Sequence, residues 1–382
     1  MSRDVVIAAA VRTPVGKRNG AYAGVHPVDL SACVLAELAA RTGIDPALVD
    51  DVIWGCVTQV SQQAMNIGRN AVLAAGWPES VPATTVDRQC GSSQQALHFA
   101  AAGVASGQYE VAVAGGVESM TRVPMGSAVT SGNLEDVFGR KMMTRYQGQE
   151  INQGLGAEMI AAKWGLSRQQ LDEFSLASHE KAAAAIASGA FAHQYVIVPG
   201  TGLHADEGVR PDTSLAKLGV LKPVFKEDGV IHAGNSSQIS DGCGAMLVTT
   251  SERATQLGLK PLVRVKTAVL AGADPIMMLT GPIPATAKAL AKSGLSISDI
   301  GAFEINEAFA PVPLAWLAET GADPERLNPL GGAIAIGHPL GGSGAVLMAR
   351  LIHHMVDNGI RYGLQSMCEG GGMANATILE LI

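Results

Sequence analysis

A segment from the first third of the chain recurs in the last third at a nearly constant spacing. Residues 43–55 (GIDPALVDDVIWG) align without a gap on residues 294–306 (GLSISDIGAFEIN), at an offset of 251 positions. A turn at Cys90 that opens an Ala-rich helix corresponds to a turn at His338 that opens another, at an offset of 248. Two near-equal offsets in separate elements indicate an internally duplicated α/β unit. Paired halves would bring the two helix starts together.

Residues 119–238 differ in composition from the rest of the first half, with scattered charged residues, several turns and two amphipathic helical stretches. After it, residues 235–249 are predicted to form a polar turn, a short helix of small residues and a strand. We expect a first half at 1–118, completed by 239–260, an inserted, mainly helical loop domain at 119–238, and a second half at 261–382. Such insertions often form substrate walls, and an oligomer contact is the alternative.

Composition excludes several functional classes. A net charge of -7 without basic runs, together with 4% aromatic residues, argues against nucleic-acid binding. The chain shows no export signal and no apolar stretch of the ~18 residues that a membrane span needs. Five cysteines without a Cys-x-x-Cys pair predict neither a disulfide framework nor a zinc site. We therefore predict a cytoplasmic protein with no membrane or metal partner, and a packing role for Cys33, Cys56 and Cys243.

Three reactive side chains lie in glycine-rich turns. Residues 328–344 place six glycines around His338, just before a predicted helix. Cys90 precedes a helix that runs to Ser106, where free amides and the helix dipole are expected to stabilise a thiolate. Cys368 joins a strand to a glycine run. A thiolate that carries an acyl group, an imidazole that takes its proton and a second thiol that moves a proton at carbon would suffice for thioester chemistry.

Seven short motifs are spread along the chain. They lie at residues 90–93 (CGSS), 115–120 (GGVESM), 235–242 (NSSQISDG), 281–284 (GPIP), 306–310 (NEAFA), 337–339 (GHP) and 368–372 (CEGGG). In this order they resemble the thiolase family over the whole length. The resemblance implies two α/β halves in a five-layer αβαβα core, an inserted loop domain, and a homodimer or homotetramer.

The resemblance also implies roles for the reactive residues. Cys90 would attack the 3-keto carbon of a 3-ketoacyl-CoA after activation by His338, and Cys368 would protonate the departing acetyl-CoA carbanion. His338 and a water held by Asn306 would form one oxyanion hole, and the backbone amides of Cys90 and Gly370 the other. Coenzyme A would be a substrate, with no bound cofactor and no metal.

Other residues are predicted to bind substrate or to support the site. Glu307 is expected to start a helix, and the remaining histidines, including His353 and His354, are expected on the solvated surface. Positions that match coenzyme A or substrate contacts in related thiolases are Arg210, Phe225, Ser237, Met278 and Phe309.

Some residues depart from the pattern of short-chain biosynthetic thiolases. Ser93 and Gln94 replace a common Gly-Leu, Gln238 replaces a Gly, and Glu369 replaces an apolar residue. These variants favour a degradative 3-ketoacyl-CoA thiolase, of the kind that includes enzymes for bulky steroid side chains. The alternative is an acetyl-CoA C-acetyltransferase acting on acetoacetyl-CoA. A ketoacyl synthase normally has His or Asn in place of Cys368, and a non-catalytic coenzyme A-binding relative would lack one of the three reactive residues.

Overall fold

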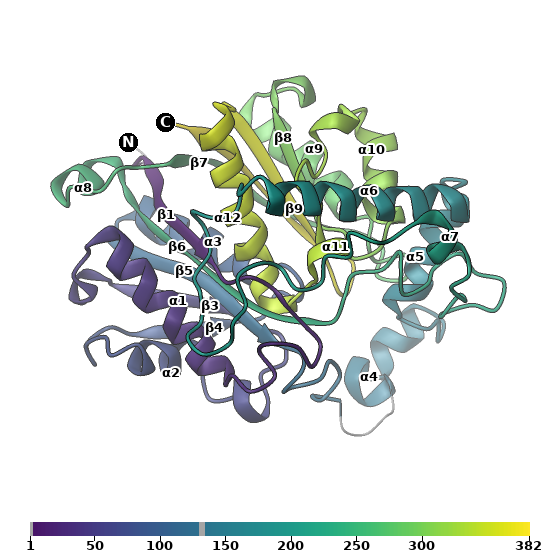
Figure 1. The fold of residues 1–382 in the computed structure, drawn as a ribbon, viewed down its shortest axis with the longest axis horizontal. Coiled ribbons are helices and arrows are strands. Elements are labelled where there is room, and N and C mark those ends of the chain that lie inside the picture. Colours follow the sequence, from purple (N-terminus) through teal and green to yellow (C-terminus); the bar gives the residue numbers. More distant parts are fainter. Residues whose placement is uncertain (1–2, 130–133) are drawn as a thin grey trace.

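The computed structural model describes residues 3–129 and 134–382, so residues 1–2 and 130–133, which fall in the expected first half and insertion, lie outside the described residues. Two groups of strands form its framework (Figure 1). In sheet order, the first group is β4 (Ala83–Val86), β3 (Asp51–Gly55), β5 (Val111–Ser119), β6 (Ser240–Thr250) and β1 (Val5–Arg12), with β2 (Gly16–Lys17) beside β6. The second is β7 (Val263–Gly272), β10 (Met373–Leu381), β9 (Tyr362–Glu369) and β8 (Ala302–Ile305).

The strand pairing reproduces the duplication. β3 and β5 are parallel with Asp51 opposite Ala112, and β8 and β9 are parallel with Ala302 opposite Gly363. Both pairs of positions are related by the same offset of 251 that aligns the sequence. The two groups join where β1 pairs with β7 at Val6 and Ile7. The expected fold class, with duplicated α/β halves, is therefore confirmed.

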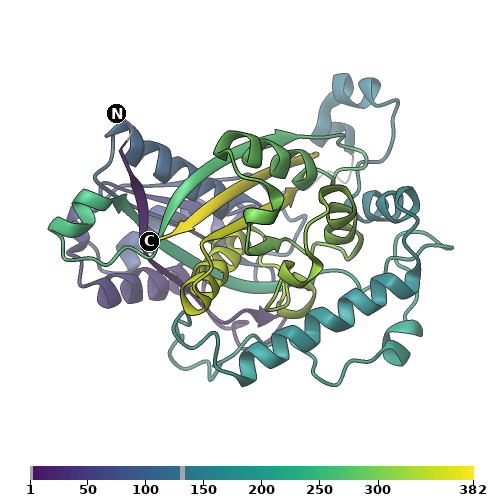
Figure 2. The same ribbon diagram turned by 90° about the horizontal axis from the view of Figure 1, so that it is seen from above.

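Helices cover both groups of strands and fill the space between them. α1 (Pro27–Thr42) and α2 (Ile67–Ala74) lie against the outer face of the first group. α9 (Pro282–Ser293) and α10 (Pro311–Thr320) lie on the outer side of the second. The buried helices α3 (Ser92–Ser106) and α12 (Leu340–Asn358) pack between the two groups and complete five layers (Figure 2).

Glycines at the strand ends let both central helix starts come close. A Cβ on Gly116 of β5 would lie 2.5 Å from the carbonyl oxygen of Gly341 and 2.8 Å from the Cβ of Ser93. These two residues belong to the first turns of α12 and α3. Because no side chain fits there, the duplicated fold places the turns before the two helices beside one another.

The segment between β5 and β6, where the insertion is expected, has its helices on one side of the molecule (Figures 1 and 2). Its part at Val196, Val198 and Leu203 packs into the core of the first group of strands. A capping box formed by Ser167 and Gln170 starts α6. The helices of the insertion are α4 (Leu134–Arg145), α5 (Gln153–Lys163), α6 (Arg168–Ala187) and α7 (Leu215–Gly219), and the short helices α8 (Ser251–Gln256) and α11 (Ala333–Ile336) lie after it.

The predicted small-residue helix within 235–249 is wrong, because residues 240–250 form the single strand β6. β6 pairs with β1 on one edge and β5 on the other, while α1 and α12 cover its faces. A strand buried on all sides needs small and apolar residues without alternation, which in sequence cannot be told from a buried helix.

Candidate active site

Cys90 lies in a tight turn between β4 and α3. The preceding residue, Gln89, has a left-handed φ of 48°, which is uncommon for a residue with a side chain. The hydroxyl of Ser92 accepts from the backbone N–H of Arg88 at 2.9 Å and donates to the carbonyl of Gln89 at 2.6 Å. The first residue of α3 thus fixes the turn that presents the nucleophilic thiol candidate.

His338 lies in the short connection between α11 and α12. Its Nδ1 is 2.6 Å from the hydroxyl of Ser343, and that hydroxyl donates to the carbonyl of Pro339 at 3.0 Å. The hydroxyl therefore accepts from an Nδ1–H, which leaves Nε2 without a proton. Burial lowers the pKa of His338 to about 4, so the ring is a neutral base near pH 7.

Asn306 links His338 to the second thiol. Its Nδ2 lies 3.5 Å from Nε2 of His338 and 3.8 Å from Sγ of Cys368, and its Oδ1 is buried without a protein partner in the described part of the chain. Burial raises the pKa of Cys368 to about 12, and the contact with Asn306 acts in the opposite direction. The three groups form one buried cluster at the ends of β8 and β9.

The Cys90 turn lies against this cluster. A Cβ on Gly370, in the turn between β9 and β10, would lie 2.9 Å from Oε1 of Gln89. Burial raises the pKa of Cys90, and the nearby Cys368 and Glu369 raise it further. A resting thiolate at the start of α3, as expected from sequence, is therefore not favoured, because desolvation outweighs the helix start and the proton needs an acceptor.

The five predicted substrate contacts fall in two places. Phe309 and Met278 belong to the same apolar cluster as Cys368, and Phe225 packs edge-on against Phe309 with ring centroids 5.9 Å apart. Arg210 and Ser237 line a cavity of about 780 Å³ together with basic residues Lys17 and Arg18. The backbone N–H of Ser237 donates to the carbonyl of Ala308, which joins this cavity to the loop after β8.

Glu307 is structural, but the prediction that it starts a helix is wrong, since α10 begins at Pro311. Its buried carboxylate accepts from the hydroxyl of Ser178, the amide of Asn328 and the backbone N–H of Ile334. Glu307 therefore connects the loop that leads to His338, through Asn328 and Ile334, to α6 of the insertion, through Ser178.

The prediction that the other histidines are solvated fails at several positions. His98 is buried with Nε2 at 2.8 Å from Thr377, and His232 is buried against Asp172 at 2.7 Å. His353 is half-buried against the carbonyl of Ala10, and His179 and His354 are buried and half-buried respectively. The sequence around a histidine does not show whether a residue from a distant element will cover it and bond to its ring.

Gln238 has a role that its sequence position did not reveal. Its side-chain Nε2 lies 2.9 Å from the backbone carbonyls of Gly208, Ile334 and Ala335. The backbone carbonyl of Gln238 accepts from the backbone N–H of His338. The side chain thus ties the insertion to α11, next to the imidazole. No local pattern announces such a contact, because its partners are backbone atoms from two remote segments.

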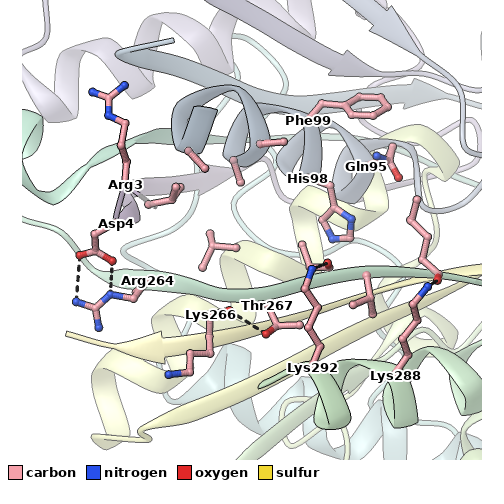
Figure 3. A pocket seen from close by; sticks show the side chains of 18 residues that line it. Arg3, Asp4, Gln95, His98, Phe99, Arg264, Lys266, Thr267, Lys288 and Lys292 are labelled. Carbon is pink, nitrogen blue, oxygen red and sulfur yellow. Dashed lines mark hydrogen bonds and ion pairs between the residues drawn. The ribbon is translucent and has the colours of Figure 1, made fainter. Parts of the chain in front are cut away.

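A large cavity of about 830 Å³ lies away from these residues, between α3 and the strand β7 (Figure 3). Figure 3 shows Lys288 and Lys292 extending from α9 to β7, where they donate to the carbonyls of Leu270 and Ala268, while His98 and Phe99 line the cavity from α3. Neither reactive cysteine, nor His338, nor Asn306 lines it. Cavity size alone would therefore misplace the reactive centre.

The duplicated five-layer fold, with two thiols, a neutral imidazole and an amide at its centre, defines a class of acyltransferases that work through thioesters. Residues 5–252 match the family of thiolase N-terminal domains and residues 259–381 match that of thiolase C-terminal domains. The chain belongs to the thiolase family.

Similar proteins agree with this assignment. The chain is 50% identical over 387 residues to the steroid 3-ketoacyl-CoA thiolase FadA6 of Mycobacterium tuberculosis, covering 99% of this chain and 94% of that one. It is 41% identical to the 3-ketoacyl-CoA thiolase of Bacillus subtilis, covering 99% and 100%. Its relatives support a degradative thiolase.

Solved structures agree as well. The acetyl-CoA acetyltransferase of Bacillus anthracis superposes with a TM-score of 0.91 at 37% identity, covering 100% of this chain and 99% of that one. Human mitochondrial 3-ketoacyl-CoA thiolase in complex with CoA gives 0.90 at 34% identity, covering 100% and 98%. Across residues 3–129 and 134–382, no helix combines the length and apolarity needed to cross a bilayer.

Proposed function

We propose that this thiolase cleaves a 3-ketoacyl-CoA by a ping-pong mechanism through an acyl group on Cys90. Nε2 of His338 takes the thiol proton as Cys90 adds to the C3 carbonyl. The C2–C3 bond then breaks, and Cys368 protonates the acetyl-CoA carbanion that leaves. Coenzyme A next attacks the acyl-Cys90 thioester and releases the shortened acyl-CoA. The observation that carries this proposal is the neutral imidazole, whose free Nε2 contacts the same amide as Cys368.

Two sets of donors would stabilise the oxyanions. We assign one to His338 and a water held by Asn306, and the other to the backbone amides of Cys90 and Gly370. The orphaned Oδ1 of Asn306 supports the first, because it offers a buried site for a water hydrogen. Donors of this kind contribute roughly 3 to 4 kcal/mol each to transition-state stabilisation.

The two groups of expected contact residues suit the two ends of an acyl-CoA. We infer that Arg210 and Ser237, in the cavity with Lys17 and Arg18, bind the phosphate-bearing coenzyme A. The apolar residues beside Cys368, namely Phe225, Met278 and Phe309, would contact the substrate near the thioester. Identity to a steroid thiolase supports a bulky acyl group. We also propose a cytoplasmic homodimer or homotetramer.

Thiolysis by the purified protein tests these assignments. The loss of 3-ketoacyl-CoA enolate absorbance is followed for acetoacetyl-CoA, a medium-chain substrate and a ring-bearing substrate at one concentration of coenzyme A. We expect rates that rise with acyl size. Activity confined to acetoacetyl-CoA would instead identify an acetyltransferase, and inactivity on all three substrates would contradict the catalytic proposal.

A further inference from the structure

Glu369 is a buried acid that the proposed mechanism does not use. It ends β9 directly after Cys368 and its side chain is fully buried. In the described part of the chain neither carboxylate oxygen meets a donor at full hydrogen-bond geometry, and the backbone N–H of Asn375 is the one donor that acts on it. A buried ionised carboxylate without donors is costly, so this arrangement calls for an explanation.

The carboxyl group is wedged against the start of α3. A Cβ on Gly91 would collide with Oε1 of Glu369 and lie 2.7 Å from Nδ2 of Asn375, so both side chains press on this glycine. Nδ2 of Asn375 donates to the carbonyl of Gly91 at 2.9 Å, whereas Oδ1 of Asn375 has no donor. Three acceptor oxygens at this corner therefore have no donor at full hydrogen-bond geometry among the described residues: both carboxylate oxygens of Glu369 and Oδ1 of Asn375. At least one more hydrogen is needed to join them by a hydrogen bond.

The duplication supplies a natural comparison, because the offset of 251 relates Glu369 to Glu118 at the end of β5. Glu118 crosses to the start of α12 and accepts from the backbone N–H groups of Val57, Thr58 and Gly341 and from the amide of Gln63, at 2.8 to 3.0 Å. Burial raises the pKa of Glu118 as well, but each of these four donors acts to lower it, and four donors are the partners that an ionised acid requires.

We propose that Glu369 is a positioning residue for the Cys90 turn and acts as a neutral carboxylic acid that donates its proton to Oδ1 of Asn375. Asn375 in turn holds the carbonyl of Gly91, one residue after the nucleophile. This inference rests on the proposed role of Cys90. It gives two of the three orphaned oxygens a place in one chain of hydrogen bonds from β9 through β10 to α3, and it leaves the third as the carbonyl oxygen of an uncharged acid, which costs less to bury than a carboxylate.

The charge of Glu369 matters to both thiols. Its titratable and charged neighbours are Asp87 and Arg88 on the Cys90 turn, together with Cys90 and Cys368. Burial raises the pKa of Glu369 to about 8. Arg88 and the backbone N–H of Asn375 act against this rise, and Asp87 adds to it. Below that pH the acid is neutral. Above it, the new negative charge opposes a thiolate on Cys90, so activity falls as the pH rises through about 8.

Glu369→Gln tests the proposal because it keeps a neutral donor at every pH. The readouts are the pH profile of kcat and the rate at which iodoacetamide alkylates Cys90, located by mass spectrometry. We expect the wild-type protein to lose kcat above pH 8 and the variant to keep it, with several-fold faster alkylation there. Glu369→Ala should lower kcat by roughly tenfold at neutral pH, as expected for one lost buried hydrogen bond. Glu304→Gln is the matched control, because Glu304 is a buried acid on β8 whose pKa burial also raises, to about 7.

An unchanged alkaline limb in Glu369→Gln, or equal kcat for the Gln and Ala variants, would overturn the inference. Infrared difference spectra of the wild-type protein and of Glu304→Gln detect protonated carboxyl groups directly, so this test does not depend on whether a Glu369 variant folds. A protonated carboxyl band that both lose through pH 8 supports the proposal, and its absence overturns it. If the protein has no thiolysis activity but the Glu369-dependent alkylation profile persists, the proposed function fails and the positioning of Cys90 stands.

Discussion

α12 and α3 begin at equivalent places of the duplicated fold, but the turns before them are held differently. The His338 turn is held from three other parts of the chain. Glu118 accepts the backbone N–H of Gly341, the carbonyl of Gln238 accepts that of His338, and Glu307 braces the approaching loop. A base that must keep one tautomer and one position benefits from such fixed supports.

The Cys90 turn is held mainly by itself. Ser92 bonds within the turn, Gln89 has a left-handed backbone, and the link from the other half comes through Asn375. In the proposed mechanism this residue set surrounds a group that changes from thiol to thiolate to thioester. Asp87 and Arg88 on the same turn have opposite formal charges, so the turn itself adds little net charge beside the thiol. The duplication therefore provides two similar helix starts. The side chains around them differ, and these differences suit the start of α12 to the proposed base His338 and the start of α3 to the proposed nucleophile Cys90.

The largest effect that would separate the two turns is expected for Cys90→Ser. Loss of the thiolate nucleophile should lower thiolysis by at least about a thousandfold and abolish the acyl-enzyme. Mass spectrometry after incubation with a 3-ketoacyl-CoA reports the adduct, and retained coenzyme A binding serves as the control for folding. A stable acyl group on another residue would contradict the assignment of the nucleophile.

Cys368→Ser tests the asymmetry between the halves, since the offset of 251 relates Cys368 to the unreactive Val117. We expect the variant to form acyl-Cys90 slowly and to lose condensation by about a hundredfold or more, because an alcohol is a poorer acid and base than a thiol here. Acylation is followed by mass spectrometry and condensation by product formation. Normal condensation would remove the role assigned to this thiol.

Glu118→Gln and Glu369→Gln sharpen the comparison of the two buried acids. In the first variant an amide NH2 replaces an acceptor among four donors, which should lower the free energy of unfolding by about 2 to 4 kcal/mol. In the second we expect a change below about 1 kcal/mol, because a neutral donor replaces another. Denaturant titration at pH 7 measures both. Equal losses in the two variants would show that the acids share one ionisation state.

Much of this asymmetry could not be predicted from sequence. The duplication, the central helices and the closeness of the two helix starts followed from spacing and periodicity, which record local structure. The partners of Glu118 and Gln238 did not, because backbone groups from remote loops leave no pattern. The raised pKa of Cys90 also depends on burial that only the assembled layers produce. Local signals thus located the reactive groups, and tertiary packing determined their protonation.

Ser343→Ala tests how the His338 turn sets the tautomer. Without the hydroxyl, the Nδ1–H loses its acceptor and the proton is free to occupy Nε2. We expect kcat to fall by about tenfold with KM unchanged, as for loss of a supporting hydrogen bond to a catalytic group. Ser298→Ala, in an exposed turn, is the matched control. A rise in KM with kcat unchanged would instead place Ser343 in substrate binding.

The smallest change in rate is expected on mild acidification, which tests the proposed base in the His338 turn. Burial lowers the pKa of His338 to about 4, so the neutral ring that accepts the thiol proton persists well below its ordinary 6.5. The initial rate of thiolysis at pH 5.5 should therefore stay within about twofold of that at pH 7. The unfolded chain binds this proton at 6.5, so the free energy of unfolding falls as the pH drops from 6.5 toward 4. Initial rates after brief exposure, with activity recovered at pH 7, separate the two effects, and a rate that halves near 6.5 would mean that the base is solvated during turnover.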